Sequence, residues 1–219
     1  LGRANPSGKL AETWPVRLAD TPSAEHFPEK GRQARYRESV YTGYRYYDAA
    51  GADVAYPFGH GLSYTEFSYR DLQVEEAPDG GPCAGREAVQ LYVAPLEPGA
   101  FRPPQEIKGF AKAALAPGEE CRVTLPLPRR AFAHYDADMR AWDVEAGAYE
   151  VRIAASSRDV RLSARVEVAG SPRREDGAPE AYHRVRPGGF SDEAFRKLYG
   201  RALPRVVVPM RPYTANATV

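Results

Sequence analysis

The chain has 219 residues, of which 43% are hydrophobic, and its 30 basic and 29 acidic residues leave a formal net charge of +1. This length allows one large domain or two small ones with a packed core. The balanced charge gives no reason to expect a nucleic acid or an anionic membrane as a partner. The 19 glycines and 20 prolines predict many turns and few long helices, and therefore a mainly β fold.

Neither a membrane span nor a metal site is expected. The chain has no run of about 18 apolar residues and no export-signal pattern. Its compartment stays open, with the cytoplasm favoured, because the chain begins without Met and we expect its natural N-terminus to lie elsewhere. Cys83 and Cys121 have no neighbouring ligands for a zinc set, so no metal and no cofactor are predicted. The pair fits a disulfide or, as the preferred interpretation, two buried thiols.

The first stretch, residues 1–66, shows no clean period of 2 or 3.6 but is rich in aromatic residues. Nine of the chain's 22 Tyr and Phe residues lie between Tyr36 and Phe67. Such rings need something to pack against, and a tyrosine hydroxyl also needs a partner. We expect an ordered arm that packs against absent domains or, in a fragment, against another copy in a homo-oligomer. The alternative is a local aromatic core.

The second stretch, residues 67–170, consists of short alternating runs separated by turn residues. Its length and pattern are typical of an immunoglobulin-like β-sandwich, which takes about 100 residues. The expected strands are residues 67–75, 87–93, 106–115, 121–127, 149–155 and 161–168. Alternation within them predicts a core that includes Val89, Leu91, Tyr149, Val151 and Ile153.

The third stretch, residues 171–219, is expected to be a linker, a short helix and an extended tail. Residues 171–189 are polar and rich in proline. Ser191 or Asp192 can cap a helix that ends at Gly200. The apolar side of this helix would be Ala194, Phe195, Leu198 and Tyr199. Prolines in the tail keep the chain extended beyond it.

Three motifs in the first stretch resemble one family when they are taken together. They read NPSGKLAETWP at residues 5–15, VYTGYRYYD at residues 40–48 and YPFGHGLSYTEF at residues 56–67. Their order and spacing resemble the end of the α/β-sandwich domain of family 3 glycoside hydrolases. Segments of the second stretch resemble the fibronectin III-like domain that follows it in that family: residues 87–93, 106–110, 115–119 and 147–151.

The resemblance implies that a parent enzyme hydrolyses β-glucosides or oligosaccharides with retention of configuration. That chemistry needs two carboxyl groups about 5–5.5 Å apart. In the family the nucleophilic Asp lies on a (β/α)8 barrel, which takes about 250 residues, and the usual acid/base Glu lies upstream of the first motif. Neither has a counterpart here, so no catalytic residue is assigned. The chain alone is expected to be inactive, with the upstream barrel and α/β domains as its partners.

Several residues of the first stretch are candidates for a position near the sugar. Glu38 and Arg45 fit either the sugar site or, the preferred interpretation, an interdomain ion pair. Four aromatic residues fit either stacking on a sugar ring or, the preferred interpretation, packing in a core or interface: Trp14, Tyr36, Tyr41 and Tyr44. The four residues Tyr36, Glu38, Tyr44 and Arg45 are therefore predicted as substrate-proximal.

The PFGHG motif is predicted to form a rigid bend into the first sandwich strand. Pro57 fixes the approach, while Gly59 and Gly61 allow a backbone path that is closed to residues with a Cβ. His60 between them fits a substrate contact or, as we prefer, a structural histidine in a tight turn.

Two departures from the family pattern suggest a fragment, and one is that the tail stops at Val219, where relatives with such an extension are expected to continue. Between residues 74 and 87 the family usually has an extra strand, whereas this chain has only a loop rich in Gly and Pro. Either the sandwich lacks one strand or residues have been lost.

The alternative to a part of a hydrolase is a stand-alone sandwich that binds carbohydrate or protein. A carbohydrate-binding module would need a row of exposed aromatic residues.

Overall fold

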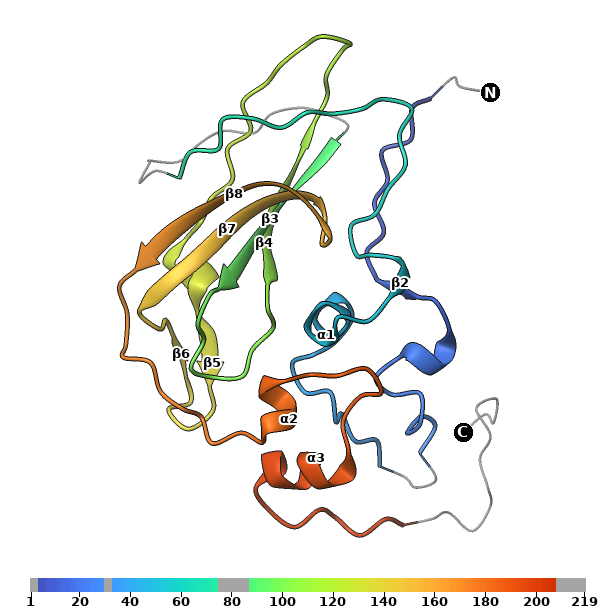
Figure 1. The fold of residues 1–219 in the computed structure, drawn as a ribbon, viewed down its shortest axis with the longest axis vertical. Coiled ribbons are helices and arrows are strands. Elements are labelled where there is room, and N and C mark those ends of the chain that lie inside the picture. The colour runs from blue at the N-terminus through green and yellow to red at the C-terminus, as the bar shows by residue number, and fades with distance from the viewer. Residues whose placement is uncertain (1–3, 30–32, 75–86, 208–219) are drawn as a thin grey trace.

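The computed structural model describes residues 4–29, 33–74 and 87–207. A twisted sheet occupies one side of the molecule, and irregular chain and short helices from both ends of the sequence occupy the other (Figure 1). The strands are β1 (Trp14–Pro15), β2 (Val54–Tyr56), β3 (Glu87–Pro95), β4 (Glu106–Ala113), β5 (His134–Asp136), β6 (Ala141–Asp143), β7 (Gly147–Ser156) and β8 (Asp159–Val168). The helices are η1 (Leu18–Asp20), α1 (Tyr44–Ala50), η2 (Arg129–Phe132), α2 (Glu180–His183) and α3 (Asp192–Tyr199).

The main sheet has the strand order β4-β3-β7-β8, and each neighbouring pair is antiparallel. In the middle of β3, Leu91 lies opposite Ile153 of β7 and Gly109 of β4. All four strands occupy stretches in which alternation predicted them, because one face of each strand has to be apolar. The predicted mainly β fold class is confirmed.

One face of the main sheet carries the larger hydrophobic core. Leu91 is 3% exposed and Val151 is 1% exposed. Phe132 of η2 closes the core from the opposite layer, and its ring meets the Tyr149 ring edge-on with the centroids 5.2 Å apart. The predicted core is confirmed in full: Val89, Leu91, Tyr149, Val151 and Ile153 are all buried in it.

The second layer of the sandwich is less regular than predicted. It contains η2, the β5–β6 hairpin and two extended stretches, residues 67–74 and 121–127. The prediction of strands for these two stretches is wrong, since neither forms a ladder within the described residues. A ladder needs a neighbouring strand about 4.8 Å away, whereas these stretches contact the core through their side chains. This packing explains the alternation of apolar residues in their sequence. The side chains that pack on the core are Tyr69, Leu72, Val123, Leu125 and Leu127.

Helix α3 forms as its capping residues predicted. The Ser191 Oγ accepts a hydrogen bond of 3.1 Å from the Ala194 amide, and Gly200 ends the helix in the left-handed region at φ 67°. Ala194 is buried, and Phe195, Leu198 and Tyr199 are half-buried. The short helix α2 was not predicted; it lies in the expected linker and brings Tyr182 into a fully buried position.

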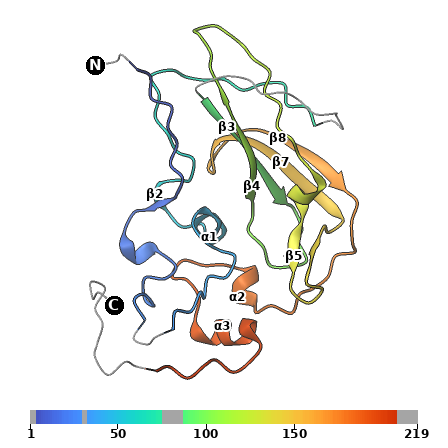
Figure 2. The ribbon, with the colours of Figure 1, turned by 180° about the vertical axis from the view of Figure 1, so that it is seen from behind.

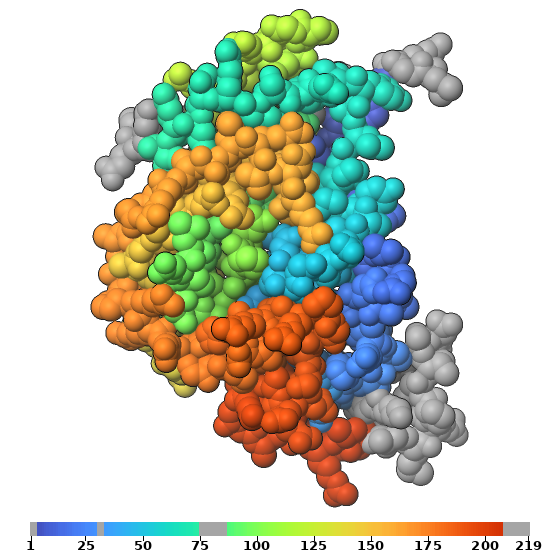
Figure 3. Space-filling view, viewed as in Figure 1, coloured from blue at the N-terminus to red at the C-terminus, as the bar shows by residue number. Residues whose placement is uncertain are grey.

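The aromatic residues of the first stretch pack against the third stretch of the same chain. Tyr41, Tyr46 and Tyr47 share a buried cluster with Tyr182 and Phe190. The Tyr182 and Phe190 rings are stacked 4.6 Å apart. In Figures 2 and 3 the orange and red segment of α2 and α3 lies directly against the blue and cyan N-terminal segment. The expectation that these buried tyrosines need another domain or copy is wrong, because residues 182–194 supply their partners.

Polar contacts hold the two ends of the chain together around this cluster. The Tyr182 hydroxyl donates to the Arg37 carbonyl at 2.7 Å. The Arg37 side chain is 6% exposed and forms ion pairs with Glu29 and with Asp192 at the start of α3. The Tyr46 hydroxyl accepts hydrogen bonds of 3.1 Å from the amides of residues 188 and 189. We call residues 179–200 the C-terminal clasp.

Three smaller expectations concern the cysteines, metals and membranes. Cys121 is exposed, so the expectation of a buried thiol is wrong there, because the side chains that pack inward in its stretch are at residues 123, 125 and 127. Cys83 lies outside the described residues. In the described ranges, no three His, Cys, Asp or Glu side chains are grouped to hold a metal ion. Nor does that part of the chain include a helix long and apolar enough to cross a membrane.

Replacing Leu91 by Ala should lower the free energy of unfolding by about 2–5 kcal/mol, because the buried side chain leaves a cavity. Phe110→Ala is the matched control in the same sheet. Its ring is 70% exposed, so we expect a change within about 0.5 kcal/mol. Urea unfolding followed by fluorescence measures both. Equal effects in the two variants would contradict the assignment of the core face.

The clasp should weaken in acid. The hydrogen bond from Arg37 holds the pKa of Asp192 below its usual range. A carboxyl with a lowered folded pKa stabilises the fold fully above its unfolded pKa of about 3.9, and this contribution disappears as the pH falls through the folded value. Asp192→Asn should therefore lower the free energy of unfolding at neutral pH, and the difference from the parent should vanish by about pH 2.

Glu193→Gln is the control for this prediction. Glu193 is the next residue of α3, and its ion pair with Lys197 is exposed at both ends, so its loss should matter less. Urea titrations at a series of pH values give the comparison. A difference between Asp192→Asn and the parent that does not change with pH would show that the Arg37 pair is not responsible.

Candidate functional site

The PFGHG turn, residues 57–61, is the point where the N-terminal segment meets the sandwich. Its amide at Gly59 donates to the Leu10 carbonyl, and the Leu10 amide donates to the His60 carbonyl, both at 2.8 Å. On its other side, the Phe58 carbonyl accepts from the Ser157 amide of the β7–β8 turn at 2.9 Å. The turn thus joins three segments that are far apart in the sequence.

The two glycines of the turn are required by close contacts. Gly59 has φ +79°, and a Cβ there would lie 2.2 Å from the Gln90 Oε1. A Cβ on Gly61 would lie 2.5 Å from the carbonyl oxygen of Gly8 and 2.6 Å from the Lys9 Cδ. Such distances are far below van der Waals contact, so a side chain at either position would force the turn away from its neighbours.

Buried polar groups of β3 fasten the turn to the sheet. Gln90 is 4% exposed, and its amide nitrogen donates to the Ala155 carbonyl at 2.8 Å and to the Gly59 carbonyl at 3.3 Å. The Tyr92 hydroxyl donates to the Gln90 Oε1 at 2.6 Å. At the end of the same strand, Glu87 forms an ion pair of 3.1 Å with Lys9. These groups therefore satisfy one another, as buried polar groups in folded proteins do.

Helix α1 presents Tyr44 and Arg45 to strand β4. The Tyr44 ring is buried between Phe58 and Tyr92, with centroid distances of 5.0 and 6.0 Å. Burial raises the pKa of this phenol, and its oxygen accepts a hydrogen bond of 2.9 Å from the Ile107 amide. Arg45 forms an ion pair of 3.0 Å with Glu106. Both side chains therefore contact the sandwich.

Tyr36 and Glu38 lie in a different environment. The Tyr36 ring is 74% exposed, whereas Glu38 is half-buried near Tyr182 and its backbone carbonyl accepts from the Tyr41 amide at 2.9 Å. The four predicted substrate-proximal residues are thus divided between the contact with β4 and the surface beside the clasp. Their role near a sugar stays a prediction.

A second polar network, which no sequence motif indicated, joins α1 to the β7–β8 turn. The Arg158 guanidinium donates to the Asp48 carboxylate at 2.9 Å and to the carbonyl of Ala52 at 2.8 Å. Gln105 also contacts Asp48, at 3.2 Å. Burial raises the pKa of Asp48, while Arg158 and Gln105 act in the opposite direction. No local pattern could have predicted a pair that is 110 residues apart in the chain.

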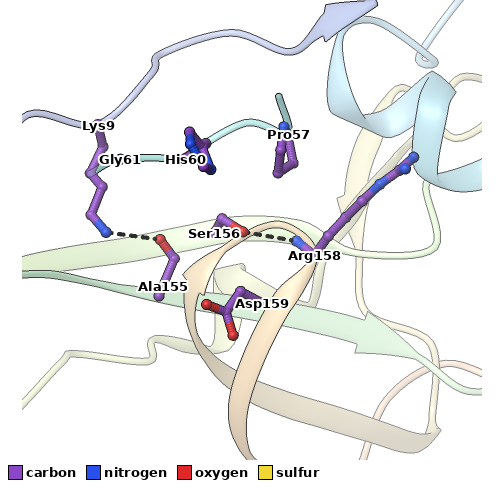
Figure 4. Close-up of a pocket in the computed structure, with 8 residues that line it drawn as sticks. All are labelled: Lys9, Pro57, His60, Gly61, Ala155, Ser156, Arg158 and Asp159. Carbon is purple, nitrogen blue, oxygen red and sulfur yellow. Dashed lines mark hydrogen bonds between the residues drawn. The ribbon is translucent and has the colours of Figure 1, made fainter. Parts of the chain in front are cut away.

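A half-open cavity of about 230 Å³ lies where the turn approaches the β7–β8 hairpin. Figure 4 shows Lys9, His60 and Pro57 on the side of the turn, and Ala155, Ser156 and Asp159 on the side of the hairpin. The Lys9 ammonium donates to the carbonyl of Ala155 at 3.3 Å across one end of it. The PFGHG motif therefore contributes both a structural bend and one wall of a cavity.

Comparison with known proteins places this architecture in a family. The Fibronectin type III-like domain family matches residues 87–157, which include β3 to β7. The structure of a GH3 β-glucosidase from Bifidobacterium adolescentis aligns with a TM-score of 0.70 and 39% identity over 78% of this chain and 27% of that one. The chain belongs to the family 3 glycoside hydrolases and corresponds to their C-terminal region.

Further relatives give the same result. The chain is 44% identical to the thermostable β-glucosidase B of Acetivibrio thermocellus over 77% of its own length. It is 39% identical to an exo-α-(1->6)-L-arabinopyranosidase of Bifidobacterium longum over 78% of its length. β-Glucosidase 3B of Thermotoga neapolitana in complex with glucose aligns with a TM-score of 0.65 and 40% identity over 77% of this chain and 25% of that one. The chain spans only 24% of the length of each of the two curated relatives.

The alignment with the Acetivibrio enzyme also includes positions that this chain lacks. It extends over 182 residues but covers only 77% of a 219-residue chain, so some aligned positions of the relative have no counterpart here.

Gly59→Ala should destabilise the junction strongly. Gly118→Ala is a matched control, because Gly118 has φ +80° but open space where a Cβ would lie. Both substitutions place a side chain on a residue in the left-handed backbone region. The difference between their effects on the free energy of unfolding therefore isolates the contact with Gln90. We expect Gly59→Ala to cost about 1–3 kcal/mol more, as overpacking does. Denaturation curves of the two variants test this, and equal losses would show that the turn is not tightly packed on β3.

Proposed function

We propose that the chain is the non-catalytic C-terminal part of a retaining, β-glucosidase-like glycoside hydrolase. The observation that carries the proposal is the junction of the PFGHG turn with β3, in which Gly59 packs directly on Gln90. Together with the Lys9–Glu87 pair, this junction fixes the N-terminal segment on the sandwich. The chain then supports the catalytic domains as a rigid buttress.

In this proposal the reaction belongs to the parent enzyme. Retaining hydrolysis uses one carboxylate as nucleophile and a second carboxyl group as acid and base. The upstream barrel and α/β domains would supply both groups. β-Glucosides or related oligosaccharides are the proposed substrate class, and no cofactor is required. The relatives are named for both β-glucosidase and arabinopyranosidase activity, which agrees with sugar preference being set outside this region.

We further propose that the division into residues 1–66, 67–170 and 171–219 reflects three roles. The first stretch would complete the α/β domain of the parent, the second is the sandwich, and the third secures the first through the clasp. Exposed apolar side chains on the first stretch support its contact with the upstream domains: Trp14, Val16, Leu18, Phe27, Tyr36, Leu62 and Tyr64. Surfaces of this kind mark interaction sites.

The substrate-proximal roles of Tyr36, Glu38, Tyr44 and Arg45 remain part of the proposal. Exposure of the Tyr36 ring supports stacking on a sugar. Arg45 and Tyr44 would act indirectly, since their contacts with Glu106 and the Ile107 amide hold α1 on the sandwich.

A stand-alone binding module is the second candidate, and one observation favours it. Tyr135 and Trp142 face each other across the β5–β6 hairpin and are each 53% exposed. Their rings, however, meet at 71° rather than in one plane, and the Arg130 guanidinium covers Trp142 at 3.9 Å. A flat platform for a polysaccharide would need coplanar faces, so we favour the supporting role.

The isolated chain should show no turnover of aryl β-glucosides, because each catalytic group contributes orders of magnitude in rate. Glu38→Gln and Asp48→Asn test whether either carboxyl acts as a catalyst. Turnover that purifies with the chain and is abolished by one of these substitutions would contradict the proposal.

A chimera tests the supporting role directly. This chain would replace the aligned C-terminal region of β-glucosidase 3B from Thermotoga neapolitana. The chimera should hydrolyse the aryl glucoside, whereas that enzyme truncated before the same region should not. A truncated enzyme that keeps full activity and stability would show that the region gives no support.

A further inference from the structure

The cavity beside the PFGHG turn has the size and position of a small ligand site. Its volume of about 230 Å³ is below the roughly 300–1,000 Å³ of clefts for drug-sized molecules, so it suits a single ring with hydroxyl substituents. It lies between two structural units, where ligand pockets preferentially occur. The buried polar contacts described above fix both of its walls.

The charged groups around the cavity are already paired. Lys9 is paired with Glu87 at 3.1 Å, and Arg158 with Asp48 at 2.9 Å. The remaining carboxylate, Asp159, is held by Arg161 at 2.7 Å. For a charged ligand, the side chains of opposite charge are therefore already neutralised by their partners. A neutral polar ligand needs only hydrogen-bond partners.

Hydrogen-bonding capacity remains on three side chains of the wall. Ser156 is 5% exposed, and its oxygen accepts from the Arg158 amide at 3.4 Å, which leaves its proton to be donated. Within the described part of the chain, the ring nitrogens of His60 have no hydrogen-bond partner. The Asp159 carboxylate retains lone pairs beyond its pair with Arg161. These groups can both donate to and accept from hydroxyls.

Two further aromatic rings extend from His60, which lines the cavity. The Tyr56 ring lies against the His60 ring with the centroids 5.0 Å apart, and Trp14 meets Tyr56 edge-on at 6.0 Å. Both outer rings are nearly half exposed, at 44% for Tyr56 and 48% for Trp14. A pyranose combines hydroxyl edges with apolar C–H faces, so that it matches a polar wall that also contains the rings of Pro57 and His60.

We propose that this cavity binds a single neutral pyranose unit. Hydroxyl groups of the sugar would hydrogen-bond to Ser156, His60 and Asp159, and an apolar face would rest against the rings of Pro57 and His60 in the wall. The choice of a saccharide among neutral polyols rests on the proposed function, whereas the site itself rests on the paired charges and the free hydrogen-bonding groups.

Titration of the 219-residue chain with D-glucose and with L-arabinose, followed by amide NMR, tests the proposal. We expect a dissociation constant of about 1 mM, with shifts confined to residues 59–61 and 155–159. Asp159→Ala should weaken binding about tenfold, as expected for a charge-assisted hydrogen bond. Arg161→Ala is the matched control, because it breaks the same ion pair but removes no group from the cavity wall, and it should bind as the parent does.

Three outcomes would overturn the site. The first is the absence of localised shifts at sugar concentrations about tenfold above the expected dissociation constant. The second is an equal loss of binding in Asp159→Ala and Arg161→Ala. The third is that inorganic phosphate alone produces the same shifts. The proposed function is judged separately by the activity of the chimera. An active chimera without sugar binding by the chain would reject only the site, while sugar binding with an inactive chimera would reject only the supporting role.

Discussion

The contact of Gly59 with Gln90 is the constraint on which the arrangement of this molecule depends. A backbone turn can approach a buried amide this closely only when no Cβ intervenes. At this contact, the side-chain nitrogen of Gln90 donates hydrogen bonds to the carbonyls of Gly59 and Ala155. A Cβ on Gly59 would collide with the Gln90 side chain and force the turn away from the sheet.

Helix α1 links the aromatic cluster to this junction, because the first residue of the cluster, Tyr41, lies only three residues before the helix. Tyr44 anchors α1 on the sandwich, while Tyr46 and Tyr47 of the same helix face the clasp. One short helix therefore contributes to two cores. Burial raises the pKa of Tyr182 to about 12, so the phenol stays protonated and keeps donating to the Arg37 carbonyl at any ordinary pH.

Local patterns in the sequence predicted what depends on neighbouring residues, and failed where the partner lies far along the chain. The alternation around Leu91 and Ile153 predicted β3 and β7, and the capping residues Ser191 and Gly200 predicted α3. The stretch 121–127 alternates equally well but forms no ladder, because pairing requires a second strand that alternation cannot supply. The pair of Asp48 with Arg158 likewise joins residues 110 positions apart.

The cavity has the same structural origin as the junction. The carbonyl of Ala155 accepts from Gln90 at 2.8 Å and from Lys9 at 3.3 Å, so one oxygen ties the hairpin to both the sheet and the N-terminal segment. Because these contacts exist without a ligand, the wall groups would lose little freedom when a sugar binds, which favours binding. Ser156 and Asp159 take no part in fastening the turn. The packing of the junction and any binding in the cavity can therefore be separated by substitution.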